Sequence, residues 1–149
     1  VLRIGICQHA EAHNFLDFGA ALGDAIARSD ARVGILASGG MSHRFPTLDT
    51  SSNHVKTAAE HVISAEARAF DEAVLARWAR GEHAGVIDSY PDYKPFKPEG
   101  LLGHYLIMAG ALGGRDWTAP GAQLSEYENA FGTGQVHVWF DLTNDRQPA

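Results

Sequence analysis

His43 is the residue best placed to carry out chemistry. It follows residues 33–37, an apolar run with the length of a buried strand, and lies on a turn in which Gly39 and Gly40 allow a tight bend. Ligands of open α/β sheets bind beyond the carboxyl ends of strands. An imidazole titrates near neutral pH and can both accept and donate a proton. The position equally suits a surface histidine that bonds to local backbone.

Other candidate nucleophiles and ligands lack a complete motif. Ser38 and Ser42 flank the same glycines, but the segment does not form the GxSxG elbow of a serine hydrolase. The chain has eight histidines and none of the HExxH, HxH or CxxC spacings of common zinc sites. His9 and His13 are four residues apart and could share a helical face. Polar residues are also common in the loop and first turn after a strand, so this pair alone does not indicate a metal.

Glu99 and a glycine-rich turn offer weaker signals. Glu99 lies at the start of an apolar segment, where an acid usually only stabilises the helix dipole. As a metal ligand it would need histidine partners. The turn at residues 132–134, Gly-Thr-Gly, could bind an anion through backbone N–H groups. A simple turn before a strand explains it equally well.

The elements expected around these residues alternate between strand and helix. Residues 1–7 and 33–37 predict strands, and apolar residues spaced by three and four predict a helix from Asn14 to Arg28 between them. A strand, helix and strand with short connections favour parallel pairing. The sequence therefore predicts an α/β fold, with a mixed or mostly parallel sheet and flanking helices, in a single unit over residues 1–149. Further expected elements are helices at 66–80 and 100–112, a proline-rich loop at 88–98, a turn at 132–135 and a closing strand at 136–141.

The bulk composition narrows the class of protein. The 149 residues are 45% hydrophobic and 20% charged, as in ordinary globular domains. The net charge of −6 disfavours nucleic acid as the main partner, because phosphate binding needs clustered Lys and Arg. The single cysteine, Cys7, excludes an internal disulfide and suits a reducing, cytoplasmic compartment. The apolar runs are too short to cross a bilayer, so no membrane partner is expected.

Four sequence blocks, in this order, resemble the class III extradiol ring-cleavage dioxygenases. Residues 35–45 resemble the segment that bears the catalytic histidine of this family. Phe70-Asp71 with the helix to Trp78, residues 98–113, and residues 132–136 resemble the following helix, the block with the glutamate iron ligand, and the closing strand. Within the family the closest similarity is to the homoprotocatechuate (3,4-dihydroxyphenylacetate) 2,3-dioxygenases.

The resemblance implies a reaction and a set of site residues. His43 would be the catalytic acid and base, and Glu99 the carboxylate of a 2-His-1-carboxylate triad that holds Fe(II). His13, Ser42 and Thr133 would contact the substrate. The reaction would open a catechol ring with both atoms of O₂. The leading substrate is 3,4-dihydroxyphenylacetate, while protocatechuate, gallate and aminophenols remain alternatives.

The resemblance covers only the C-terminal half of the family's chain. In the family the two histidine ligands lie in the N-terminal half, so a preceding segment or a partner chain is expected to supply them. Residues 1–149 are then expected to be inactive alone, and the family implies a homo-oligomer. A non-catalytic binding or scaffold relative is the first rival, although it would need neither His43 nor Glu99. A metal-assisted hydrolase is the second, and it would need more ligands.

Overall fold

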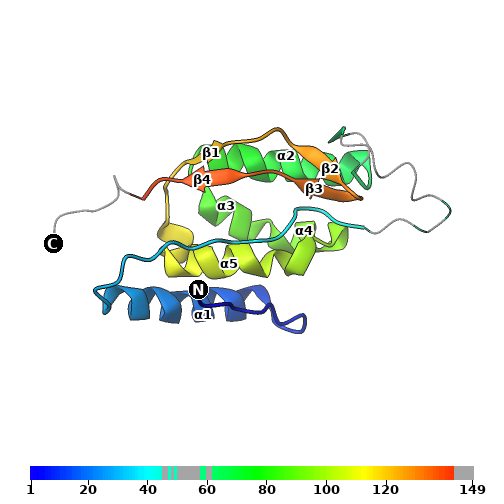
Figure 1. Cartoon of the computed structure of the whole chain (residues 1–149). Helices are drawn as coiled ribbons and strands as arrows, with labels where there is room; N and C mark the ends of the chain where they lie inside the picture. Colours follow the sequence, from blue (N-terminus) through cyan, green and yellow to red (C-terminus); the bar gives the residue numbers. More distant parts are fainter. Residues whose placement is uncertain (45–46, 48, 50–57, 60–61, 143–149) are drawn as a thin grey trace.

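The fold combines helices with short strands, which confirms the α/β class (Figure 1). A computed structural model describes residues 1–44, 47, 49, 58–59 and 62–142. The helices are α1 (Ala12–Ala27), α2 (Ala65–Ala79), α3 (His83–Asp88), α4 (Tyr90–Tyr93) and α5 (Gly103–Ala111), with the 3₁₀ helices η3 (Lys94–Phe96), η4 (Glu99–Leu102) and η5 (Gly114–Asp116). The strands are β1 (Gly121–Gln123), β2 (Glu128–Ala130), β3 (Thr133–Gln135) and β4 (Val138–Phe140).

Helices α1 and α5 lie side by side and form one face of the core (Figure 1). Glycines allow this close approach, since a Cβ on Gly19 would collide with the carbonyl oxygen of Ile107, and a Cβ on Gly110 with that of Leu16. Most residues of α5 are buried, as expected for a helix that is apolar on all sides.

The described strands form two antiparallel pairs, β1 with β4 and β2 with β3. Phe131 and Gly132 connect β2 to β3, and their φ values of 55° and 87° fit the two-residue turn that such hairpins favour. The turn predicted at residues 132–135 is therefore wrong over its last three residues, because residues 133–135 form β3. The alternation predicted for the closing strand is confirmed: Val136, Val138 and Phe140 are partly buried, and His137, Trp139 and Asp141 are exposed.

The strands predicted at residues 1–7 and 33–37 are wrong. Neither run forms a ladder with other described residues, and no parallel pair occurs in this part of the chain. A strand exists only through hydrogen bonds to a neighbouring strand, which apolar composition by itself does not provide. In the second run the side chains alternate in exposure: Ile35 and Ala37 pack against the core, and Leu36 between them is exposed.

The helix predictions differ from the structure mainly at the ends. Helix α1 starts at Ala12, and the expected N-cap Asn14 lies in its first turn, where Oδ1 accepts the N–H of Glu11 at 3.0 Å. The helix predicted at 66–80 is confirmed as α2, and Gly81 follows its end with a φ of 69°. The loop predicted at 88–98 is wrong, since α4 and η3 lie within it. Pro91 and Pro95 occupy the first turns of these helices, where a missing N–H carries no cost.

His83, at the start of α3, is a fully buried histidine in an aromatic cluster. Its ring stacks on Trp117 with centroids 3.5 Å apart. Nε2 lies 2.9 Å from the carbonyl oxygen of Ala119, and Nδ1 lies 2.9 Å from the hydroxyl of Tyr105. Because a carbonyl only accepts, Nε2 carries the proton and Nδ1 accepts from the tyrosine. Burial lowers the pKa of His83, so the folded state favours the neutral ring.

We expect acid to destabilise the protein through His83. Since the pKa of His83 is lowered on folding, its stabilising contribution is complete above about pH 6.5 and is lost as the pH falls through the folded pKa. The measurement is the free energy of unfolding in urea across this range for the parent, His83→Gln and the exposed control His9→Gln. The decline should be shallower in His83→Gln alone. Equal slopes in all three proteins would contradict the assignment.

Candidate active site

The segment that carries His43 lies alongside strand β3. His43 and Thr133 form an antiparallel bridge. The N–H of Met41 donates to the carbonyl oxygen of Gly134 at 2.8 Å, and the N–H of Gly134 donates to that of Ser42 at 2.9 Å. The residues around His43 thus extend the small β2–β3 sheet by one strand-like segment.

Glu99 binds the other side of the same segment. Its N–H donates to the carbonyl oxygen of Met41 at 3.0 Å, and its Oε2 accepts the N–H of Gly40 at 2.5 Å. Close by, the N–H of His43 donates to the carbonyl oxygen of Phe96 at 3.1 Å. These hydrogen bonds therefore hold Glu99 against the short segment, residues 40–43, that ends at His43.

Gly39 and Gly40 are required here by close approach. A Cβ on Gly40 would collide with Cγ2 of Thr133 and lie 3.0 Å from Oε2 of Glu99. A Cβ on Gly39 would collide with the ring of His104. The sequence explained these glycines by a tight turn, but the structure shows neighbouring side chains packed against their α-carbons.

The backbone beside Glu99 is strained. Gly100, Leu101 and Leu102 have φ values of 59°, 55° and 54°, and Lys97 has a φ of 50°. Left-handed conformations in non-glycine residues cost on the order of 1 kcal/mol or more and are concentrated at functional sites. The same stretch explains why α5 begins at Gly103, three residues after the predicted start of its helix.

His104, in the first turn of α5, completes the surroundings of Glu99. Its Nε2 lies 3.1 Å from the carbonyl oxygen of Glu99, and its Nδ1 is buried with no partner among the described residues. Burial lowers the pKa of His104, which favours a neutral ring. No sequence motif pointed to this histidine, because its partner is a backbone carbonyl.

Asp71 is a fully buried carboxylate that accepts hydrogen bonds from three residues. Ser42 donates twice, from its hydroxyl to Oδ2 at 2.6 Å and from its backbone N–H to Oδ1 at 3.1 Å. The hydroxyl of Tyr93 donates to Oδ1 and that of Tyr127 to Oδ2, both at 2.6 Å. The carboxyl group of Asp71 therefore ties α2 to the residue before His43.

Burial and hydrogen bonding act on Asp71 in opposite directions. Burial raises the pKa of the carboxyl group, and the donors from Ser42, Tyr127 and Tyr93 offset part of that rise. The pKa values of Tyr93 and Tyr127 are raised by burial and by the nearby carboxylate, so both hydroxyls stay protonated and available as donors.

The sequence signal for Asp71 was its position on α2. Asp71 is three or four residues from the neighbouring buried residues of that helix, so it lies on the buried face. A charged residue on a buried face needs hydrogen-bond partners. The buried residues of this face are Ala67, Asp71, Val74 and Trp78.

The structure brings together four of the five predicted site residues and leaves one apart. His43, Ser42, Thr133 and Glu99 lie within one hydrogen-bonded cluster. His13 lies in the first turn of α1, exposed, with Nε2 3.0 Å from the side-chain nitrogen of Asn14. Ser42 and Thr133 are 0% and 5% exposed, so their side chains face the interior. The substrate contacts predicted for His13, Ser42 and Thr133 stay predictions.

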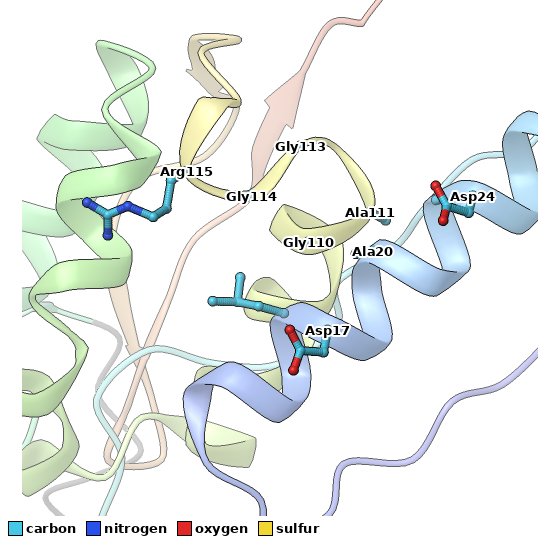
Figure 2. A pocket seen from close by; sticks show the side chains of 10 residues that line it. Asp17, Ala20, Asp24, Gly110, Ala111, Gly113, Gly114 and Arg115 are labelled. Carbon is cyan, nitrogen blue, oxygen red and sulfur yellow. The ribbon is translucent and has the colours of Figure 1, made fainter.

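The surface of the described residues includes the following two open hollows. One, of about 310 Å³, borders His43 and is lined by His43, Arg44, Ile63, Ser64, Pro95, Phe96 and Lys97. The other, of about 570 Å³, lies between α1 and the end of α5. Figure 2 shows Asp17 and Asp24 on its α1 side and Arg115 near its edge. This second hollow contains none of the predicted site residues, and Arg115 is paired with Asp88.

The described residues do not complete a metal site. Glu99 offers one exposed carboxylate, and the part of the chain that the structure describes contains no group of three His, Cys, Asp or Glu residues able to hold an ion. A 2-His-1-carboxylate triad needs two further nitrogen ligands. Glu99 alone does not bind ferrous iron firmly.

A family model described as the catalytic LigB subunit of aromatic ring-opening dioxygenase matches residues 2–140. The match covers nearly the whole chain, so the chain belongs to this family of aromatic ring-opening dioxygenases. No curated protein sequence matches the chain. Among the residues that the structure describes, no helix is long and apolar enough to cross a membrane.

We expect the hydroxyls that bind Asp71 to stabilise the protein measurably. Tyr93→Phe and Tyr127→Phe each remove one hydrogen bond to a buried carboxylate, which should lower the free energy of unfolding by about 1.5–3 kcal/mol. Tyr90→Phe is the matched control, because the buried Tyr90 hydroxyl has no partner among the described residues. Its removal should be neutral or stabilising in urea denaturation. A loss in Tyr127→Phe no larger than in Tyr90→Phe would contradict this role for Asp71.

Proposed function

We propose that this chain carries the proton-transfer residue and the carboxylate ligand of an extradiol dioxygenase, which opens a catechol ring with O₂ and Fe(II). The observation that supports the proposal is that Glu99 hydrogen-bonds to Gly40 and Met41, in the same segment that carries His43. The family match supports the reaction class, ring opening of an aromatic compound.

Glu99 would supply the carboxylate of the iron site. Its Oε2 accepts the Gly40 N–H, and its own backbone N–H donates to Met41, so side chain and main chain are both anchored. Two histidines from outside the described residues, in a preceding segment or a partner chain, would complete the triad. Fe(II) in such a triad offers open positions for a diol and for O₂.

His43 would move the protons of the reaction. A catechol must lose a hydroxyl proton to become a good electron donor, and the oxygen that enters the ring must later gain one. One imidazole can do both if it is held close to the ring. The bridge to Thr133 and the hydrogen bond to Phe96 fix the backbone of His43 on both sides, and the hollow beside it is open to a small molecule.

The leading substrate is 3,4-dihydroxyphenylacetate, with protocatechuate, gallate and aminophenols as alternatives. The single cysteine, Cys7, is compatible with a reducing, cytoplasmic setting. A homo-oligomer follows from the family resemblance alone. The rival is a scaffold relative without catalysis, and the retention of His43 and Glu99 in one cluster favours the enzyme.

We expect Glu99→Ala and Glu99→Gln to lose iron. Gln keeps an oxygen for the Gly40 N–H but lacks the charge that a metal ligand needs. The measurement is the iron content of the purified full-length protein, with the exposed Glu126→Ala as control. Both Glu99 variants should contain little iron, and the control should contain as much as the parent. Full iron occupancy in Glu99→Gln would show that the carboxylate ligand lies elsewhere.

We expect His43→Phe to retain iron and to lose turnover. Positioned general acids and bases contribute about 10²–10⁴-fold to rates, so the turnover number should fall by that order. The assay is the yellow ring-opened product formed aerobically from 3,4-dihydroxyphenylacetate, with the exposed His137→Phe as control. Unchanged turnover in His43→Phe would remove His43 from this role. If the iron-loaded parent opened no catechol at all, the scaffold function would replace the enzyme.

A further inference from the structure

The hollow beside His43 is cationic in a chain whose overall charge is negative. The chain has 18 acidic and 12 basic residues, excluding histidine. Among the residues that the structure describes, the lining of this hollow nevertheless includes Arg44 and Lys97 and no acidic residue. Its remaining lining is mixed, with the apolar Ile63, Pro95 and Phe96 beside the polar Ser64 and His43. Positive charge beside an apolar wall suits a small molecule with an aromatic ring and an anionic group.

Local backbone contacts place the two cationic residues next to each other. The N–H of His43 donates to the carbonyl oxygen of Phe96 at 3.1 Å, and Arg44 and Lys97 are the next residues after these two. The N–H of Arg44 donates to the carbonyl oxygen of Gly132 at 3.2 Å. Lys97 has a left-handed backbone, with φ 50° and ψ 56°. Both cations are therefore held close to the proposed acid and base by the backbone around them.

The charges of Arg44 and Lys97 are not neutralised within the described part of the chain. The ion pairs found there join Arg80 to Glu82, Lys94 to Glu11 and Arg115 to Asp88. Two neighbouring cations without an acidic partner repel each other, and a bound anion relieves that repulsion. The planar fork of an arginine matches a carboxylate in two parallel hydrogen bonds, and a lysine adds a point charge.

We propose that Arg44 and Lys97 form the subsite for a carboxylate on the side chain of the substrate, so that the enzyme selects catechols that carry an acidic substituent. The proposal rests on the proposed function, because it takes His43 as the end of the pocket where the ring reacts. The apolar wall of Ile63 and Phe96 contacts the carbon skeleton between the diol and the carboxylate.

The test compares an acidic catechol with a neutral one. Full-length, iron-loaded parent, Arg44→Gln and Lys97→Gln are assayed with 3,4-dihydroxyphenylacetate and with 4-methylcatechol, which lacks the carboxylate. Each substitution should raise the KM for the acid on the order of tenfold and leave the KM for 4-methylcatechol unchanged, because only the acid loses a charged hydrogen bond. Lys94→Gln is the control, since Lys94 pairs with Glu11 outside the hollow. Lys97→Arg, which keeps the charge, should retain most of the affinity.

Two results would overturn the subsite: an unchanged KM for the acid in both variants, or equal increases for both catechols. A failure of the proposed function itself is recognised separately, by the absence of ring-opened product from either catechol. In that case calorimetric titration of the parent with the same two compounds, without oxygen, still decides the subsite. A preference for the acid that disappears in Arg44→Gln and Lys97→Gln supports it. Equal binding of both compounds rejects it.

Discussion

The buried carboxylate of Asp71 is the constraint on which the candidate site depends. It is 0% exposed, and it accepts from the hydroxyls of Tyr93 and Tyr127 and from both donors of Ser42. A carboxylate in the interior is tolerated only when its hydrogen-bond acceptors are satisfied. The four donors belong to three residues in separate parts of the chain, so satisfying Asp71 joins these parts and fixes the residue next to His43.

Around that anchor, the segment from Gly40 to Arg44 is held on both sides. Strand β3 binds one edge, and Glu99 with Phe96 binds the other. Such a segment has little freedom to move, which suits a residue that must present an imidazole in one position. The left-handed residues on either side of Glu99 and the glycine packed against His104 are the local costs of this arrangement.

The same backbone contacts link the proposed proton-transfer residue, His43, to the proposed carboxylate subsite. Arg44 and Lys97 each follow one member of the hydrogen-bonded pair His43 and Phe96, and both line the same hollow. The proposed proton-transfer residue and the proposed carboxylate subsite are therefore parts of one structural unit. Glu99, close by in the chain, belongs to it as well. The proposed metal is the exception, since the described residues contain no group of three His, Cys, Asp or Glu side chains that could hold it.

The sequence by itself determined the local features of this protein. Helices α1 and α2 followed from apolar spacing, and Gly81 marked the end of α2, because these signals depend on neighbours within one or two turns. His43 and Glu99 were predicted as site residues from their surroundings in the sequence, and these roles stay predictions. The tertiary structure alone decided that residues 1–7 and 33–37 form no ladder, that Asp71 is an internal acceptor, and that Arg44 lies beside Lys97. Each of these depends on partners far away in the chain, and local sequence does not specify which distant donor, acceptor or strand edge will meet it.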